Sequence, residues 1–387
     1  MESIRVESPI LWSHCELYVL CVLFEIVDIA NINILLHLPR IRLKTLIMQK
    51  KFLFCLFYIF CSIKIGIAQT TVICERLSLF NEIKKDVAAE YWPEFGRDTN
   101  QSPLIYVTDS FSYVFNSDPE FLKDSVVSAI KCGEKNLKKI RNVDARPFVM
   151  ENRMSFSDRN SPFFYNPVMM CSSVEIMLKN IPDFTTSEEW SQLVLHEYFH
   201  SFQFRNKAVI DYLADTIKFS ADTLTYFYLN DSVFKNSLRE ENRFLLAAIR
   251  TNSIDSAGYY YKKFIEERAL RRTYFRLKYE YDITTYENFW EKIEGTARYV
   301  EYYCGDIFYH YSKSKMKITD PLFKNFSAFN KKNFSEGKHF KEREEMMAYY
   351  FYVTGFNLCR LMDKLKIEYK SVLFKNGGVA LTDLLQR

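Results

Sequence analysis

The sequence predicts an α+β protein that is mostly helical, with a small N-terminal sheet and a helical C-terminal half. Of its 387 residues, 48% are hydrophobic, which is enough for a sizeable core and excludes a globally disordered chain. Only 10 glycines and 10 prolines are present. Few turns are therefore forced, and long helices are favoured.

The chain begins with two segments that we expect to lie outside the folded domain. Residues 48–68 have the pattern of a signal peptide, with two lysines, an apolar run and small residues before a cleavage site after Ala68. The apolar run is shorter than the ~20 residues that span a bilayer, although a retained membrane anchor is the alternative. Because a signal peptide belongs at a chain start, we interpret residues 1–47 as a start-site artefact or a disordered segment. The mature chain is then exported, periplasmic or secreted, and contacts a membrane only through an uncleaved signal segment.

Residues 69–185 are expected to form an α+β subdomain, because helical and strand patterns alternate there. Predicted helices cover 76–91 and 119–140, and predicted strands cover 104–107, 147–156 and 168–170. Five cysteines remain after residue 68, and none forms a CxxC pair. We therefore expect no cysteine zinc site and at most one or two disulfide bridges.

Residues 186–387 are expected to form a helical subdomain. Thr186 and Glu189 form a capping box, in which each side chain satisfies a backbone amide of the other, and this opens a helix through residue 204. A second capping box at Thr284 and Glu287 opens a helix through about residue 303. Two or three helices are expected over 208–280, joined near 230–231 and 253–258, and another over 341–365.

Charge and glycine positions exclude several functional classes. The chain carries 52 Lys and Arg against 48 Asp and Glu, a net charge of +4, which argues against a nucleic-acid binder with a dense basic surface. Neither GxGxxG nor GxxxxGK[ST] spacing is present, and there is no GxSxG motif. We therefore expect no nucleic-acid or nucleotide partner.

The helix that follows Thr186 contains the motif H-E-x-x-H, at His196, Glu197 and His200. Side chains four residues apart lie one above the other on a helix, so both imidazoles can bind one metal ion. Glu197 lies beside the first ligand, where it can take a proton from a zinc-bound water whose pKa is lowered toward about 7. The apolar neighbours of the motif indicate a buried helix, which argues against two surface histidines and favours a Zn²⁺ site.

A catalytic zinc site usually has three protein ligands, so one more is needed. Glu294 is the best candidate, because the small Gly295 beside it lets another helix approach closely. Glu301, two turns farther along the same face, can hydrogen-bond a ligand imidazole. Glu301 or His310 as the third ligand remains an alternative, as does an ordinary exposed Glu294.

H-E-x-x-H at 196–200 followed by E-G-x-x-x-Y-x-E at 294–301 resembles the gluzincins, metallopeptidases whose third zinc ligand is a glutamate on a second helix. The closest motifs are those of the M1 aminopeptidase and M61 branches. The resemblance implies a zincin-like metallopeptidase fold for residues 69–387, with Glu294 as the third ligand. Those branches place the glutamate much closer to the second histidine, so we expect an insertion at 201–289 that covers the cleft or extends the core.

Two further motifs are similar to segments of these branches. Tyr352 and Gly355 match a Y-x-x-G, which implies that the Tyr352 hydroxyl stabilises the oxyanion; Tyr349 is the reserve candidate and core packing the alternative. The tripeptide M-E-N at 150–152 is similar to the strand with which M1 aminopeptidases hold a substrate amine. It lacks the leading glycine of that strand, so we interpret the match as coincidence.

Together these features predict an exported zinc metallopeptidase that hydrolyses a peptide or protein substrate. The predicted zinc ligands are His196, His200 and Glu294, with Glu197 as general base and Tyr352 as oxyanion donor. The competing prediction is a non-catalytic exported protein, a degenerate zincin or a binding module, that keeps a structural metal site. A third is a metal-dependent hydrolase of a non-peptide amide or ester.

Overall fold

The computed structural model describes residues 70–97, 102–116, 126–142, 146–156, 165–217, 221–310, 319–327 and 349–386, except for residues 88 and 134. The chain divides into two compact units, Met1–Thr70 and Thr71–Arg387, and the second is described below. The expected signal peptide at 48–68 and the segment 1–47 lie outside the described residues. None of the described helices combines the length and hydropathy that crossing a bilayer requires.

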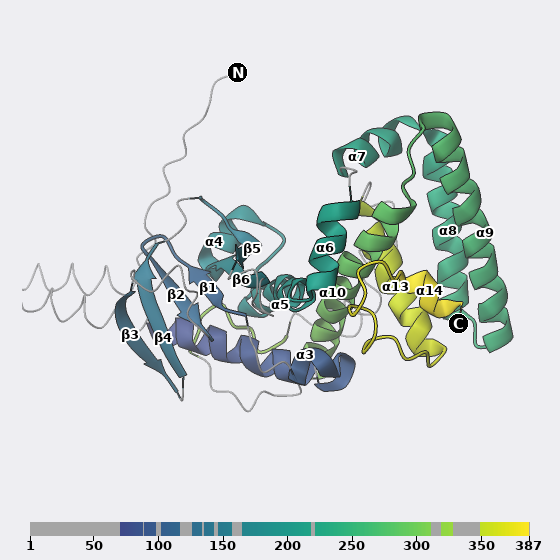
Figure 1. Cartoon of the computed structure of the whole chain (residues 1–387). Helices are drawn as coiled ribbons and strands as arrows, with labels where there is room; N and C mark the ends of the chain where they lie inside the picture. Colours follow the sequence, from purple (N-terminus) through teal and green to yellow (C-terminus); the bar gives the residue numbers. More distant parts are fainter. Residues whose placement is uncertain are drawn as a thin grey trace, which may run out of the picture. The chain divides into compact units, whose positions relative to one another are not determined.

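A six-stranded sheet forms the first part of the unit, in the order β3-β4-β2-β1-β6-β5 (Figure 1). Its strands are β1 Leu104–Val107, β2 Phe111–Phe115, β3 Val126–Cys132, β4 Lys135–Arg141, β5 Met150–Phe156 and β6 Tyr165–Ser172. Strands β1 and β6 are parallel, and the other neighbouring pairs are antiparallel. Successive side chains of β1 enter different hydrophobic clusters, because strand side chains alternate between the two faces of a sheet.

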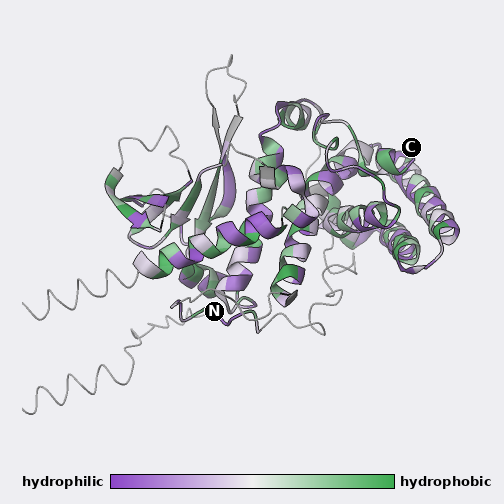
Figure 2. Ribbon diagram, turned by 90° about the horizontal axis from the view of Figure 1, so that it is seen from below, coloured by the Kyte–Doolittle hydropathy of each residue, from purple (hydrophilic) through white to green (hydrophobic). Residues whose placement is uncertain are grey.

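Helices make up most of the rest, which confirms the expected mostly helical α+β class. They are α3 Pro93–Arg97, α4 Val174–Asn180, α5 Ser187–Phe204, α6 Lys207–Thr216, α7 Ala221–Asn230, α8 Ser232–Arg250, α9 Ile254–Tyr279, α10 Thr284–His310, α13 Phe351–Lys364 and α14 Leu381–Leu385. Residues 70–87 and 89–91 are also helical. Figure 2 shows that these helices carry both hydrophobic and hydrophilic residues.

Helix α5 lies against strands β5 and β6 and against α10, while α10 also packs along α13. The large core cluster combines residues of α5, α10 and α13 with one face of the sheet. The helices that carry His196, His200 and Glu294 are therefore held by the main core of the unit.

The helices of the expected insertion belong to the core as well. Phe234 of α8 and Phe275 of α9 are fully buried and cluster with Tyr350. Arg271 of α9 is also buried and pairs with Glu287 of α10. Burial of such a charge is tolerated only with a partner, so these contacts fix α9 against α10.

The expected helix over 119–140 is wrong within its described part, where β3 and β4 form a hairpin. The turn between them contains Gly133, whose φ of 59° is a left-handed conformation that favours glycine. Leu137 and Ile140 are buried on β4, while the lysines between them stay partly exposed. The β-branched residues of this segment favour strands, and Gly133 favours a turn between them. Together they form a hairpin, although the spacing of the apolar residues suggested a helix.

Other boundaries differ less from the expectation. Strand β2 and helix α4 were not expected. The described residues between 207 and 279 include four helices, because α6 ends at Thr216, where the next residue, Ile217, has an extended backbone.

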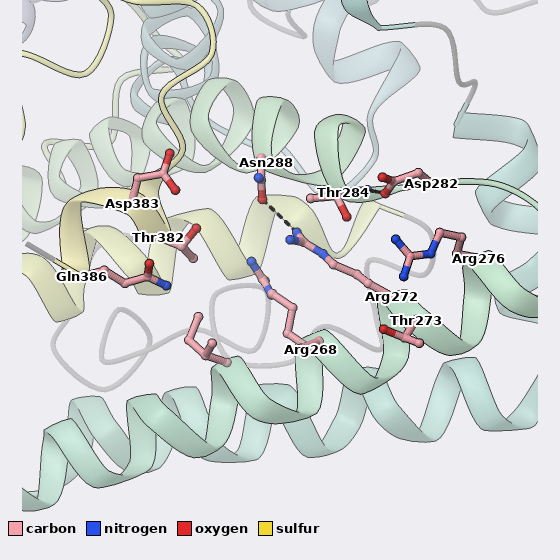
Figure 3. A pocket seen from close by; sticks show the side chains of 12 residues that line it. Arg268, Arg272, Thr273, Arg276, Asp282, Thr284, Asn288, Thr382, Asp383 and Gln386 are labelled. Carbon is pink, nitrogen blue, oxygen red and sulfur yellow. Dashed lines mark hydrogen bonds between the residues drawn. The ribbon is translucent and has the colours of Figure 1, made fainter.

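The capping box expected at Thr284 is wrong, because Thr284 is the first residue of α10 and its amide donates to Asp282 Oδ1 at 2.8 Å. The Glu287 carboxylate instead accepts hydrogen bonds from Arg271 and Arg272. Asp282 and Thr284 also line the cavity in Figure 3, between α9, the start of α10 and α14. The start of the helix expected over 341–365 lies outside the described residues, and its described part is α13.

One disulfide is present among the described cysteines, between Cys74 and Cys132. It links the first described helix to strand β3, with 5.4 Å between the Cα atoms. This agrees with the expectation of one or two bridges. Cys171, Cys304 and Cys359 are buried and free.

Candidate metal centre

Helix α5 presents its two histidines from a well-anchored position. The expected capping box is confirmed: the Glu189 amide donates to Thr186 Oγ1 at 3.2 Å, and the Thr186 amide donates to Glu189 Oε2 at 2.9 Å. Asn152 of strand β5 donates to the Glu197 carbonyl oxygen at 2.6 Å and accepts a hydrogen bond from the Ser201 hydroxyl. The sheet therefore holds the backbone of the H-E-x-x-H turn directly.

Helix α10 brings Glu294 to both imidazoles, the position that the resemblance implied for a third ligand. Glu294 Oε2 lies 3.5 Å from His196 Nε2 and 3.2 Å from His200 Nε2. One ligand atom from each of the three residues lies within 4.8 Å of the others, and all three residues are buried. His196, His200 and Glu294 can therefore hold a metal ion.

The hydrogen bonds of Gln203 fix the tautomer of His200. Gln203 Nε2 donates to the Ile293 carbonyl oxygen at 2.8 Å, which can only accept, so the opposite amide atom is oxygen. That oxygen lies 2.7 Å from His200 Nδ1, which must carry the proton. The free electron pair of a neutral His200 is therefore on Nε2, the atom that faces Glu294.

His196 is oriented in the same way by a carboxylate. Its Nδ1 lies 2.9 Å from Glu301 Oε2, the contact expected from the spacing on α10. Arg298 in turn donates to both Glu301 oxygens, at 3.0 and 2.9 Å. A carboxylate that accepts a hydrogen bond from Nδ1 leaves the lone pair of the imidazole on Nε2, the nitrogen that would bind the metal. The same hydrogen bond makes the imidazole more basic and so a better metal ligand.

The contacts of Glu294 fit a cation held between the three groups. Glu294 Oε2 is buried and has no hydrogen-bond partner within the described part of the chain, and it faces two Nε2 atoms. Burial would lower the pKa of His196, but the nearby carboxylates of Glu294 and Glu301 raise it to about 10. The pKa of Glu294 falls despite its burial, because the two imidazoles stabilise its charge. Two nitrogens and one carboxylate oxygen are the donor set of many catalytic zinc sites.

The two expected catalytic residues lie beside this group. Glu197 is partly buried, and its burial raises its pKa. The two histidines oppose this rise, whereas the nearby Glu294 carboxylate adds to it. The Tyr352 ring lies 6.1 Å from the His196 ring and nearly parallel to it. Burial and the adjacent Glu294 carboxylate raise the pKa of Tyr352, which keeps its hydroxyl protonated as a donor.

The remaining candidates have other contacts. Glu151 accepts hydrogen bonds from Arg146 and Arg153 and is partly exposed. Tyr349 is 44% exposed, and the side chain of His310 lies outside what the structure describes.

Sequence reasoning missed three supporting residues. Gln203 was open to inference, because it lies three residues after His200 on the same helix face. Arg298 similarly lies three residues before Glu301. Asn152 was considered only as part of the M-E-N tripeptide. No feature of the sequence around it indicates that its strand packs against α5.

Comparisons with protein-family models, with curated proteins and with solved structures found no match to this chain. Interpretation of the site therefore depends on its geometry and on the chemistry of its donor set.

Proposed function

We propose that this protein is an exported zinc metallopeptidase with a zincin-like fold. The observation that carries the proposal is the convergence of His196 and His200 from α5 with Glu294 from α10 on one point. Hydrogen bonds on both Nδ1 atoms support a metal site. The adjacent, partly buried Glu197, which is not one of the three ligands, supports a catalytic role for it.

Each residue then has a defined task in peptide hydrolysis. His196, His200 and Glu294 would hold the zinc ion, which would supply a water molecule with a pKa of about 7 and a Lewis acid for the substrate carbonyl group. Glu197 takes the proton of the attacking water and passes it to the departing amine nitrogen. The Tyr352 hydroxyl donates a hydrogen bond to the oxyanion as the carbonyl carbon becomes tetrahedral.

The position of strand β5 supports a peptide as the substrate. In the described part of the sheet β5 is the last strand, and its Asn152 contacts the backbone of Glu197. An extended peptide can add to a sheet edge through main-chain hydrogen bonds. A peptide bound along β5 would therefore lie beside the general base.

Two features support export. Residues 48–68 have the signal-peptide pattern. The disulfide between Cys74 and Cys132 is typical of proteins that mature in an oxidising compartment.

Replacement of Glu197 by Gln tests the catalytic assignment. The variant should keep wild-type zinc content, because Glu197 is not a ligand, and should lose peptide turnover by about 10²–10⁴-fold. The matched control is Glu240→Gln on the exposed side of α8, which should change neither quantity.

Wild-type cleavage by Glu197→Gln would remove Glu197 from the mechanism. A zinc-loaded wild-type protein that cleaves nothing in a broad peptide library would contradict the peptidase proposal and favour a structural metal site.

A further inference from the structure

Two glutamine side chains of α5 reach the backbone of α10 on either side of the candidate ligands. Gln192 Nε2 donates to the Glu301 carbonyl oxygen at 2.9 Å. Gln203 Nε2 donates to the Ile293 carbonyl oxygen at 2.8 Å. The two glutamines are eleven residues apart, about three helical turns, so they lie on the same face of α5. Both ligand histidines lie between them in the chain, and Glu294 lies between the two acceptors.

Of these two glutamines, only Gln203 also contacts a candidate ligand. Its Oε1 lies 2.7 Å from His200 Nδ1, and its Nε2 also donates to Thr296 Oγ1 at 2.7 Å. The Gln203 side chain is fully buried. Among the residues that the structure describes, Gln192 makes no hydrogen bond to either histidine. Gln203 therefore joins the His200 ring to the turn of α10 that carries Glu294.

An amide is the group that fits this position. The Ile293 carbonyl oxygen can only accept a hydrogen bond. The Thr296 hydroxyl donates its proton to the Lys292 carbonyl oxygen at 2.6 Å, so toward Gln203 it also acts as an acceptor. Nδ1 of His200, in contrast, carries a proton and needs an acceptor. An amide has two N–H donors and a carbonyl acceptor, whereas a carboxylate only accepts and an apolar side chain does neither.

We propose that Gln203 is a positioning residue, which sets His200 against Glu294 before a metal binds; the inference rests on the proposed zinc site. The two candidate ligand atoms, His200 Nε2 and Glu294 Oε2, lie 3.2 Å apart. Metal–ligand distances tolerate only about 0.2 Å. A ring that loses its link to the facing helix should therefore bind a metal less tightly.

Loss of the Gln203 side chain would also change the metal-free imidazole. Without an acceptor at Nδ1, a neutral His200 would carry its proton on Nε2, where Glu294 Oε2 would accept it. That tautomer blocks the nitrogen that would bind the metal. Gln203 therefore keeps the lone pair of His200 available for a metal.

Replacement of Gln203 by Met tests the proposal, because Met is unbranched and of similar length but has no strong donor or acceptor. We expect the zinc affinity of Gln203→Met to fall about 10–100-fold in a chelator competition. Gln203→Leu, which also lacks both polar groups, should give the same result. The matched control is Gln192→Met, which removes a hydrogen bond between α5 and α10 but none to an imidazole, and should bind zinc like the wild type. Urea unfolding of the metal-free proteins establishes that each variant is folded.

A purely structural role for Gln203 predicts the same change in zinc affinity for the two Met variants. The proposal is overturned if Gln203→Met binds zinc as tightly as the wild type, or only as weakly as Gln192→Met. Peptide cleavage does not enter these measurements. A protein with the expected affinities that cleaves no peptide would contradict the peptidase function and support this inference, whereas a wild-type protein that takes up no zinc would contradict both.

Discussion

The crossing of α10 and α13 makes Gly295 the most informative position for substitution. A Cβ atom on Gly295 would lie 2.3 Å from the Gly355 Cα and 2.5 Å from its carbonyl carbon. Carbon atoms pack at about 3.5–4.0 Å, so Gly295→Ala must separate the helices by more than about 1 Å. The obstacle is backbone on both sides, which no change of rotamer can relieve.

Overpacking of this kind costs roughly 1–3 kcal/mol, against a gain of about 1 kcal/mol from replacing glycine by alanine within a helix. The difference is a net cost of about 0–2 kcal/mol. Because backbone atoms cause the clash, we expect Gly295→Ala to lower the free energy of unfolding by about 2 kcal/mol, at the upper end of that difference. The adjacent Glu294 would move with α10. Because metal–ligand distances tolerate only about 0.2 Å, zinc affinity should fall about tenfold or more.

Urea unfolding of the metal-free protein and zinc competition against a chelator measure the two effects. The matched control is Gly258→Ala in α9, where an added Cβ would meet nothing within 4 Å. That change should stabilise the protein by up to about 1 kcal/mol and leave zinc affinity unchanged. A Gly295→Ala protein with wild-type stability and zinc affinity would refute the helix-crossing argument.

Three further predictions concern single side chains. Glu301→Gln should weaken zinc binding about 10–100-fold in a chelator competition, because Glu301 orients His196 through Nδ1; unchanged affinity would contradict this. Tyr352→Phe should lower kcat about 10²–10³-fold on a cleaved peptide without changing zinc content, and an unaltered kcat would leave Tyr352 a packing residue. Although burial raises the pKa of Asp231, hydrogen bonds from Tyr279 and from the Phe234 amide hold it at about 2. This lowered pKa stabilises the fold fully above the unfolded value of about 4, and the contribution is lost as the pH falls toward about 2. Asp231→Asn should therefore lose about 1–2 kcal/mol at pH 7 in urea unfolding and little at pH 2, and a loss that persists at pH 2 would contradict the assignment to charge.

The parts of the fold that local sequence determines were predictable. Helix α5 begins where its capping box indicates, because Thr186 and Glu189 lie within one turn of each other. The H-E-x-x-H spacing likewise needs only helix geometry to bring His196 and His200 together.

The parts that depend on distant contacts were less accessible. The β3–β4 hairpin was missed because Lys138 and Lys139 resembled the basic end of a helix, whereas pairing with β2 decides the conformation of β4. The meeting of Glu294 with the histidines was inferred from a resemblance, since no local pattern relates α5 to α10. The roles of Gly295 and Gly355 as a helix-crossing point emerge only when both backbones are in place.

The most direct test of the central claim is the metal content of the purified protein, measured by elemental analysis with X-ray absorption of the bound metal. The claim requires one zinc per chain, coordinated by two imidazole nitrogens and a carboxylate oxygen, and at least about tenfold weaker binding in Glu294→Gln. A wild-type protein that takes up no zinc, or a Glu294→Gln variant that binds zinc as tightly as the wild type, would contradict it.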